Sequence, residues 1–192
     1  MVRIVEHLTL GEIDAGLPHI LRSPKDGGLL QMIVRRPAVG TREVLAEGTL
    51  DVAAGLVGDT WRMRSSRRTA DGSPHPDMQL NVMSVRVIAL LAQGEERWPL
   101  AGDQLFVDLD LSAANLPVGT ALAMGSAIIQ VTAQPHTGCD KFVARFGVAA
   151  MKFVNSPSGT ALRLRGLNAR VVHPGVVRVG DVVRKVEGWT ST

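Results

Sequence analysis

One short polar segment contains the residue types needed for thiol chemistry. It reads Gln134-Pro-His-Thr-Gly-Cys-Asp-Lys-Phe142 and contains Cys139, the only cysteine of the sequence. Helical spacing follows it, and Asp140 is a residue type that caps helices. We therefore expect Cys139 beside a helix N-terminus, where free N–H groups favour a thiolate. A thiolate attacks electrophiles, accepts sulfur or binds a soft metal.

The charges expected around this thiol are mostly positive. Lys141, Arg145 and His136 would add positive charge near Cys139, whereas Asp140 would oppose them. Gly138 lets the backbone approach a ligand closely or take an unusual φ. The segment therefore contains three candidate catalytic residues: Cys139, His136 and Lys141.

Two other interpretations of Cys139 remain open at this point. It could be a small buried hydrophobe, as many free cysteines are. It could also be the nucleophile of a hydrolase with a histidine as base, although no hydrolase motif accompanies it. The candidate bases are His136, His75 and His173.

Other catalytic and metal-binding motifs are missing from the sequence. It has no GxGxxG after a strand, no Walker motif, no HExxH and no G-x-S-x-G. Its five histidines lack metal-ligand spacing, and a single cysteine excludes an intramolecular disulfide or a CxxC motif. We expect no structural metal.

Composition and charge exclude several classes of protein. The chain has 192 residues, of which 45% are hydrophobic and 20% charged, which suits one globular domain. The net charge is only +3 although the pI is 9.6. The densest basic run, 62–68, lies beside Trp61 but has no ladder of aromatics for stacking on bases. It indicates a solvated loop, and we expect no nucleic-acid partner.

The sequence also argues against export and membrane insertion. Glu6 and His7 interrupt the N-terminus where a signal peptide needs an apolar core. The longest apolar run, Val87 to Ala92, is far shorter than the ~20 residues of a membrane span. We expect a cytoplasmic protein.

The elements that must position the cysteine segment are mostly short strands. Two helices are expected, at 85–93 after Ser84 and at 141–154, where Phe142, Phe146 and Phe153 recur on one face. Residues 41–50 fit a strand or a short helix, and 65–77 fit an exposed loop. The remaining strands are expected at 29–34, 60–63, 79–83, 104–111, 120–124, 127–132, 166–173 and 181–186.

Aspartates recur at several turns and on one strand. The pair Gly-Asp occurs at 58–59, 102–103 and 180–181, which we interpret as repeated turn chemistry. Asp108 and Asp110 would share one face of a strand, and two solvated positions on an edge strand are favoured over a cation site.

These elements predict a mainly β (α+β) fold. Many short strands with Gly/Pro turns favour a strongly curved sheet or closed β-barrel with a few flanking helices. Breakers around Pro18 and Pro24 set residues 1–28 apart as an N-terminal arm, and residues 29–192 would form the body.

Four motifs in order resemble the MOSC domain, named after the C-terminal domain of molybdenum-cofactor sulfurase. They are Gly55-Leu-Val-Gly-Asp59, Asn115-Leu-Pro-Val-Gly-Thr-Ala-Leu122, the Cys139 segment and Gly166-Leu-Asn-Ala-Arg-Val-Val-His-Pro-Gly-Val-Val-Arg-Val-Gly-Asp181. The resemblance runs from about Leu29 to Val186. Each motif alone is weak evidence for this family. Their order, together with a single cysteine late in the sequence, makes the resemblance specific.

The resemblance implies a MOSC-type β-barrel in which Cys139 is a persulfide carrier or a molybdenum ligand. Relatives that hold the molybdenum cofactor reduce N-hydroxylated small-molecule substrates. The expected partners are therefore a sulfur donor such as a cysteine desulfurase, or an electron-donor reductase. The alternatives are a β-barrel module that binds an anionic small molecule without catalysis, and a cysteine-dependent hydrolase.

The sequence departs from the larger members of that family. They carry a further N-terminal β-domain and, in the sulfurases, a pyridoxal-phosphate domain, neither of which is expected here. We therefore expect no self-sufficient sulfurase activity, and a single lobe must bind an anionic pterin through its own basic residues. Lys141 and Arg145 are favoured by their closeness to Cys139, and the other candidates are Arg42, Arg62, Arg64, Arg163 and Arg165.

Overall fold

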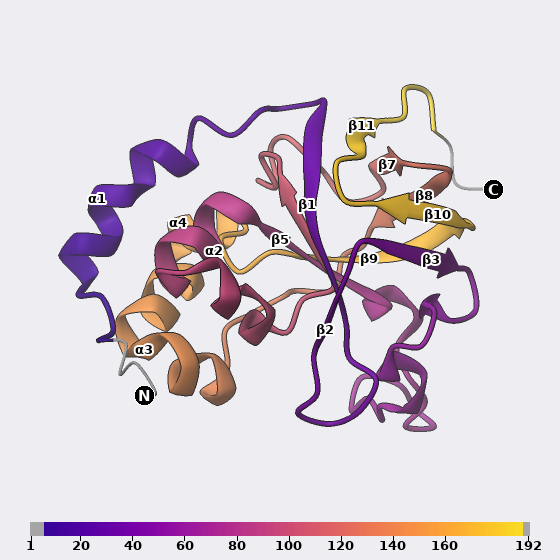
Figure 1. Cartoon of the computed structure of the whole chain (residues 1–192), viewed down its shortest axis with the longest axis horizontal. Coiled ribbons are helices and arrows are strands. Elements are labelled where there is room, and N and C mark those ends of the chain that lie inside the picture. The colour runs from indigo at the N-terminus through magenta and orange to yellow at the C-terminus, as the bar shows by residue number, and fades with distance from the viewer. Residues whose placement is uncertain (1–5, 190–192) are drawn as a thin grey trace.

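The chain folds into a closed β-barrel flanked by helices (Figure 1). The structure is a computed structural model that describes residues 6–189. Within them, eight strands form one sheet in the order β11-β7-β8-β9-β5-β6-β1-β2, and β1 also pairs with β11. That pairing closes seven strands into a ring, with β2 outside it. The ring strands are β1 (Gly28–Arg35), β5 (Leu80–Ser84), β6 (Leu105–Asp108), β7 (Ala121–Met124), β8 (Ala127–Val131), β9 (Leu167–His173) and β11 (Val182–Lys185).

Strand β1 closes the barrel because its two ends have different partners on one side. Its start pairs with β11, its end pairs with β2 (Glu43–Leu45), and β6 runs along its other side. The β5–β6 pair is parallel, and its crossover contains α2 (Val85–Ala92) and the 3-10 helix η3 (Glu95–Ala101). A second sheet has the order β10-β3-β4, from Gly175–Arg178, Glu47–Asp51 and Gly55–Leu56.

Two hydrophobic cores lie on opposite faces of the barrel wall. Leu30 and Ile33 of β1 face a barrel interior filled with aliphatic side chains. Met32 and Val34 of the same strand face the helices. Because both faces of the second half of β1 are covered, three consecutive apolar residues, Met32 to Val34, are buried there, whereas buried and exposed residues alternate in its first half. The mainly β fold with a closed barrel and flanking helices is therefore confirmed.

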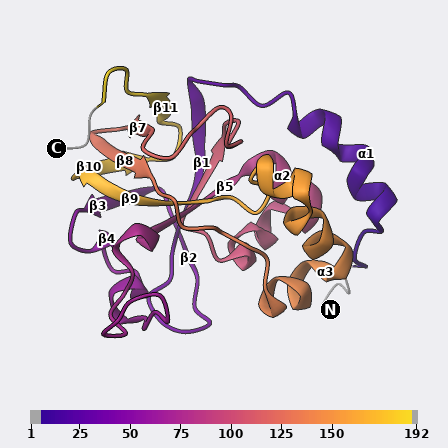
Figure 2. The same cartoon turned by 180° about the vertical axis from the view of Figure 1, so that it is seen from behind.

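The helices form a layer on one side of the barrel (Figures 1 and 2). Helix α1 (Leu10–Ile20) is capped by Thr9, which forms a capping box with Glu12. It packs on α2 and on α3 (Asp140–Asn155), and Ile13 is completely buried between them. The segment expected as an arm thus contributes a helix to this layer. The short helix α4 (Pro157–Ala161) follows α3.

Helix α3 is interrupted at Gly147, where the sequence predicted one continuous helix. Gly147 has φ 91° and ψ 166°, which divides the helix into residues 140–146 and 148–155. Side chains with the spacing of a single face still pack together, since Phe142, Phe146 and Phe153 are all buried. The interruption matters for the cysteine segment, which lies at the start of this helix.

Other local predictions were wrong in identifiable ways. Residues 60–63 form a 3-10 helix, η1 (Thr60–Met63), because the Asp59 side chain accepts a hydrogen bond from Trp61 N. Strand β6 lies between β5 and β1 and is not an edge strand. It ends at Asp108, which pairs with Arg86 at 2.7 Å. Asp110 lies beyond the strand and accepts from Ser112 N, so the two aspartates do not share a strand face.

The remaining differences are small. Residues 41–50 contain β2 and part of β3, as one of the two expectations allowed, and β10 follows Pro174 where the sequence predicted only a turn. Within 65–77, the predicted loop is broken only by the start of a 3-10 turn, η2 (Pro76–Met78).

Candidate functional site

Cys139 lies on the surface at the start of α3. Its thiol is exposed, which contradicts the alternative that it is a buried hydrophobe. Cys139 itself occupies the N-cap position, and its carbonyl oxygen accepts from Phe142 N and Val143 N at 2.8 and 3.0 Å. The predicted cap, Asp140, is instead the first helical residue. The thiol is therefore next to the helix N-terminus, as expected.

The Cys139 loop, residues 132–139, joins β8 to α3 and is anchored by side chains. Asn168, on β9, donates from Nδ2 to the carbonyl oxygens of Gln134 and Pro135 at 3.1 and 3.2 Å. Arg68, in the exposed loop 65–77, donates to Gln134 Oε1 at 2.9 Å. The loop is thus tied to the barrel wall on one side and to a surface loop on the other.

His136 points into the protein and not toward the thiol. Its Nδ1 is buried 3.5 Å from Asp103 Oδ1 and has no hydrogen bond within the described residues. Burial, together with the positive charges of Arg165 and Arg36, holds the pKa of His136 well below its ordinary 6.5. His136 is therefore neutral at neutral pH, and the expectation that it adds positive charge near Cys139 was wrong.

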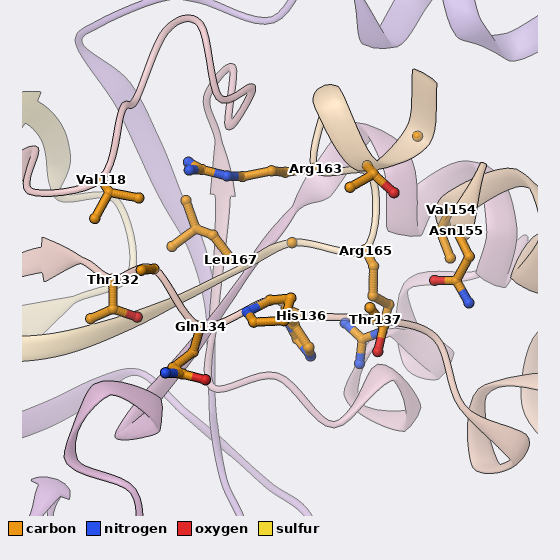
Figure 3. A pocket seen from close by; sticks show the side chains of 15 residues that line it. Val118, Thr132, Gln134, His136, Thr137, Val154, Asn155, Arg163, Arg165 and Leu167 are labelled. Carbon is orange, nitrogen blue, oxygen red and sulfur yellow. The ribbon is translucent and has the colours of Figure 1, made fainter. Parts of the chain in front are cut away.

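A cavity of about 120 Å³ borders the loop on the side of α4 (Figure 3). His136, Arg163 and Arg165 line it together with Thr137 and Asn155. Arg163 donates to Leu116 O at 2.6 Å, and burial lowers its pKa.

Two buried ion pairs lie beneath the loop. Arg36 binds both carboxylate oxygens of Asp59 at 2.7 and 2.8 Å, and Arg165 binds Asp103 at 2.8 Å. Both carboxylates are almost fully buried. Burial raises the pKa of Asp103 from its ordinary value, while the Arg165 charge opposes the rise. Arg36 also donates to Asn81 Oδ1, which extends the polar network into β5.

Sequence reasoning missed this network, although a signal was present. Asp59 and Asp103 belong to the Gly-Asp pairs that we interpreted as turn chemistry. Asn168 belongs to the motif that begins at Gly166, and it is completely buried. A role in a turn does not by itself require a buried carboxylate. The sequence could not show which aspartates would form buried ion pairs with arginines.

Arginines gather around the turn between η3 and β6. Arg36 donates to Gly102 O at 2.7 Å, and Arg145 donates to Leu100 O at 2.5 Å. A Cβ placed on Gly102 would lie 3.7 Å from Arg42 Nη2 and 3.8 Å from Arg145 Nη1. We call Arg36, Arg42, Arg64, Arg145 and Arg165 the arginine cluster.

The arginine cluster has more positive than negative charge. Within residues 6–189, the ion-pair partners of its members are Asp59 and Asp103. Burial, followed by the charges of Arg145 and Arg36, lowers the pKa of Arg42. Burial and the charge of Arg36 likewise lower the pKa of Arg64, although part of that side chain is exposed. Such mutual repulsion would be relieved by a bound anion.

The structure thus brings four of the predicted basic residues together: Arg42, Arg64, Arg145 and Arg165. Arg62 and Lys141 are exposed, and neither side chain has a hydrogen bond or ion pair in the described part of the chain. Arg163 contacts the barrel rim at Leu116 and stands apart from the cluster.

The described residues place two limits on the site. Among residues 6–189, no group of three or more His, Cys, Asp or Glu side chains could hold a metal ion. No helix in the same range is both long and apolar enough to cross a membrane.

Comparison with known proteins agrees with this architecture. Residues 100–184 match the family model of the MOSC domain. The YuaD protein from Bacillus subtilis is similar in structure, with a TM-score of 0.62 and 16% identity over 81% of this chain and 93% of that one. YiiM from Escherichia coli has a TM-score of 0.53 and 20% identity over 85% of this chain and 72% of that one. No curated protein sequence matches the chain.

The fold is therefore that of a small β-barrel protein with a surface cysteine loop. Residues 100–184, which include the Cys139 loop and the whole C-terminal motif, match the MOSC domain, and over this range the resemblance seen in the sequence is confirmed.

Proposed function

We propose that this protein binds the molybdenum cofactor, with Cys139 as ligand of the metal and the arginine cluster as the site of the anionic pterin. The observation that carries the proposal is the excess of arginines over carboxylates around Gly102. A protein that only passed sulfur through a thiol would have no need of this charge.

The residues present fit such a group. Within residues 6–189, Arg42 has no ion pair and its buried Nε has no hydrogen bond, so a donor is available for a phosphate oxygen. The exposed Cys139 is a soft donor of the kind that binds molybdenum. When bound, the cofactor would supply the two-electron chemistry needed to reduce N-hydroxylated substrates.

The chain itself would bind, orient and charge-balance the cofactor. Arg42, Arg64 and Arg145 would neutralise the anion, and the ion pairs of Arg36 and Arg165 would hold the surrounding backbone in place. Neutral His136, packed against Asp103, would support the Cys139 loop from below and add no charge.

The rival hydrolase interpretation has less support. Within residues 6–189, no hydrogen bond joins an imidazole to Cys139, and His136 Nδ1 faces Asp103. His75 Nδ1 accepts from Asp77 N in a different loop. A nucleophile and its base normally lie within hydrogen-bond reach.

The test is the cofactor content of protein purified without oxygen from a host that makes the cofactor. Molybdenum and pterin would be measured for the natural protein, Cys139→Ser, Arg42→Gln and, as a control, Arg22→Gln, which alters an exposed arginine outside the cluster. We expect Cys139→Ser to lose molybdenum, Arg42→Gln to retain less pterin and Arg22→Gln to match the natural protein.

Two results would contradict the proposal. Natural protein without pterin, even after reconstitution with free cofactor, would favour the non-catalytic binding module. A single added sulfur atom on Cys139 without metal, seen by native mass spectrometry, would favour a sulfur carrier instead.

A further inference from the structure

We propose that Asn155, at the end of α3, is the positioning residue that holds Cys139 at the start of the same helix. The proposal rests on the assignment of Cys139 as the reacting thiol. It concerns a residue that neither the motifs nor the arginine cluster includes.

The contact is a pair of hydrogen bonds to a single backbone unit. Gly138 N donates to Asn155 Oδ1 at 2.8 Å, and Asn155 Nδ2 donates to Gly138 O at 3.1 Å. Gly138 directly precedes Cys139, so one carboxamide satisfies both polar backbone groups of the residue next to the thiol. A carboxamide suits this contact because its acceptor oxygen and its donor nitrogen are separate atoms on one planar group.

The interruption at Gly147 makes this contact feasible. A straight helix of 16 residues would place its two ends about 24 Å apart. Gly147, at φ 91°, turns the second half back, so that Met151, Val154 and Asn155 come next to Gly138. A Cβ on Gly138 would already lie 3.3 Å from Met151 and Val154, so the packing there is close.

Cys139 is therefore held from both sides. Its carbonyl oxygen is bound within the first turn of α3, and the preceding residue is bound by the second half of that helix. Phe142 belongs to the same first turn, and the guanidinium carbon of Arg165 lies over its ring, 4.9 Å from the ring centre. Fixing Gly138 thus fixes the thiol relative to the arginine cluster.

The test compares the natural protein with Asn155→Ala, Asn155→Gln and Asn115→Ala. Asn115 is the matched control, because its carboxamide also bonds backbone carbonyls, those of Lys25 and Asp110. The first measurement is hydrogen exchange of the Gly138 amide by NMR. We expect about fivefold faster exchange in Asn155→Ala, a smaller change in Asn155→Gln and no change in Asn115→Ala.

The second measurement is the ratio of the rates at which iodoacetate and iodoacetamide alkylate Cys139. Both reagents use the same thiolate, so the ratio reports the charge around the sulfur and not the amount of thiolate or general stability. We expect a ratio above that of a short cysteine peptide, a drop of at least twofold in Asn155→Ala, and partial rescue in Asn155→Gln.

The outcomes separate the two proposals. An unchanged exchange rate of the Gly138 amide in Asn155→Ala would overturn the positioning role. If the natural protein favours iodoacetate, a faster exchange with an unchanged alkylation ratio in this variant would overturn it too. A natural protein with the ratio of a peptide would contradict the cofactor site. In that case, the exchange rate of the Gly138 amide alone would decide whether Asn155 has the positioning role.

Discussion

Asp59 is a single residue on which the polar interior depends. Both its carboxylate oxygens bind Arg36, and it also caps η1. Removing one partner of a buried pair leaves the other charge without compensation, so Asp59→Ala should lower the free energy of unfolding by about 3–5 kcal/mol. Urea denaturation would measure this. The double variant Asp59→Leu, Arg36→Met should recover most of the loss, and no recovery would show that the charge pair is not the cause.

His136 should make the stability sensitive to pH. Its pKa in the folded protein lies well below 6.5, so below pH 6.5 the unfolded chain takes up a proton that the folded one does not. The free energy of unfolding should therefore fall as the pH drops from about 6.5, by up to about 1.4 kcal/mol per pH unit.

The measurement is the free energy of unfolding between pH 5 and 7.5 for the natural protein and His136→Gln. The variant should show a flatter curve than the natural protein, because it lacks the buried imidazole. Parallel curves for His136→Gln and the natural protein would mean that His136 titrates alike in both states.

At the scale of elements, the sequence predicted the helices and strands that local patterns of apolar and turn residues determine. Strand β1, helix α2 and the β7–β8 hairpin follow from apolar runs and turn residues, and their approximate bounds were predicted. The interruption at Gly147 was not, because the spacing of Phe142, Phe146 and Phe153 suits one face whether or not the helix is broken. The Asn155–Gly138 contact depends on that interruption, so it too lay beyond the sequence.

The interruption of α3 should require a glycine at position 147. Its φ and ψ belong to a region that is essentially restricted to glycine, and a Cβ there would lie 2.8 Å from His7 Cβ. Gly147→Ala should lower the free energy of unfolding by about 1–3 kcal/mol and speed the exchange of the Gly138 amide. Gly72→Ala is the control, since Gly72 also has positive φ, 73°, but open space around it. Equal effects of the two variants would show that the fold-back needs no glycine.

At the scale of the molecule, the barrel wall couples the site to both cores. The Cys139 loop leaves the barrel from β8, is bound by Asn168 of β9, and enters a helix whose inner face packs in the helical layer. The members of the arginine cluster are remote in sequence: they lie just after β1, just before β2, just after η1, within α3 and just before β9. The pairings of β1 with β6, of β6 with β5 and of β5 with β9 bring these segments together. Because each pairing joins residues far apart in the sequence, residue patterns alone could not assemble the site.

This coupling predicts that α1 folds with the rest of the chain. Ile13 is completely buried against the helical layer, whereas Leu10 of the same helix is 46% exposed. Ile13→Ala should lower the free energy of unfolding by about 2–5 kcal/mol, because it leaves a cavity, and Leu10→Ala should cost much less. Urea denaturation followed by tryptophan fluorescence and by far-ultraviolet circular dichroism would measure both. If α1 were an independent arm, Ile13→Ala would leave the midpoint of the barrel transition unchanged. A single transition that shifts in both signals would show that the helix, the layer and the barrel unfold as one unit.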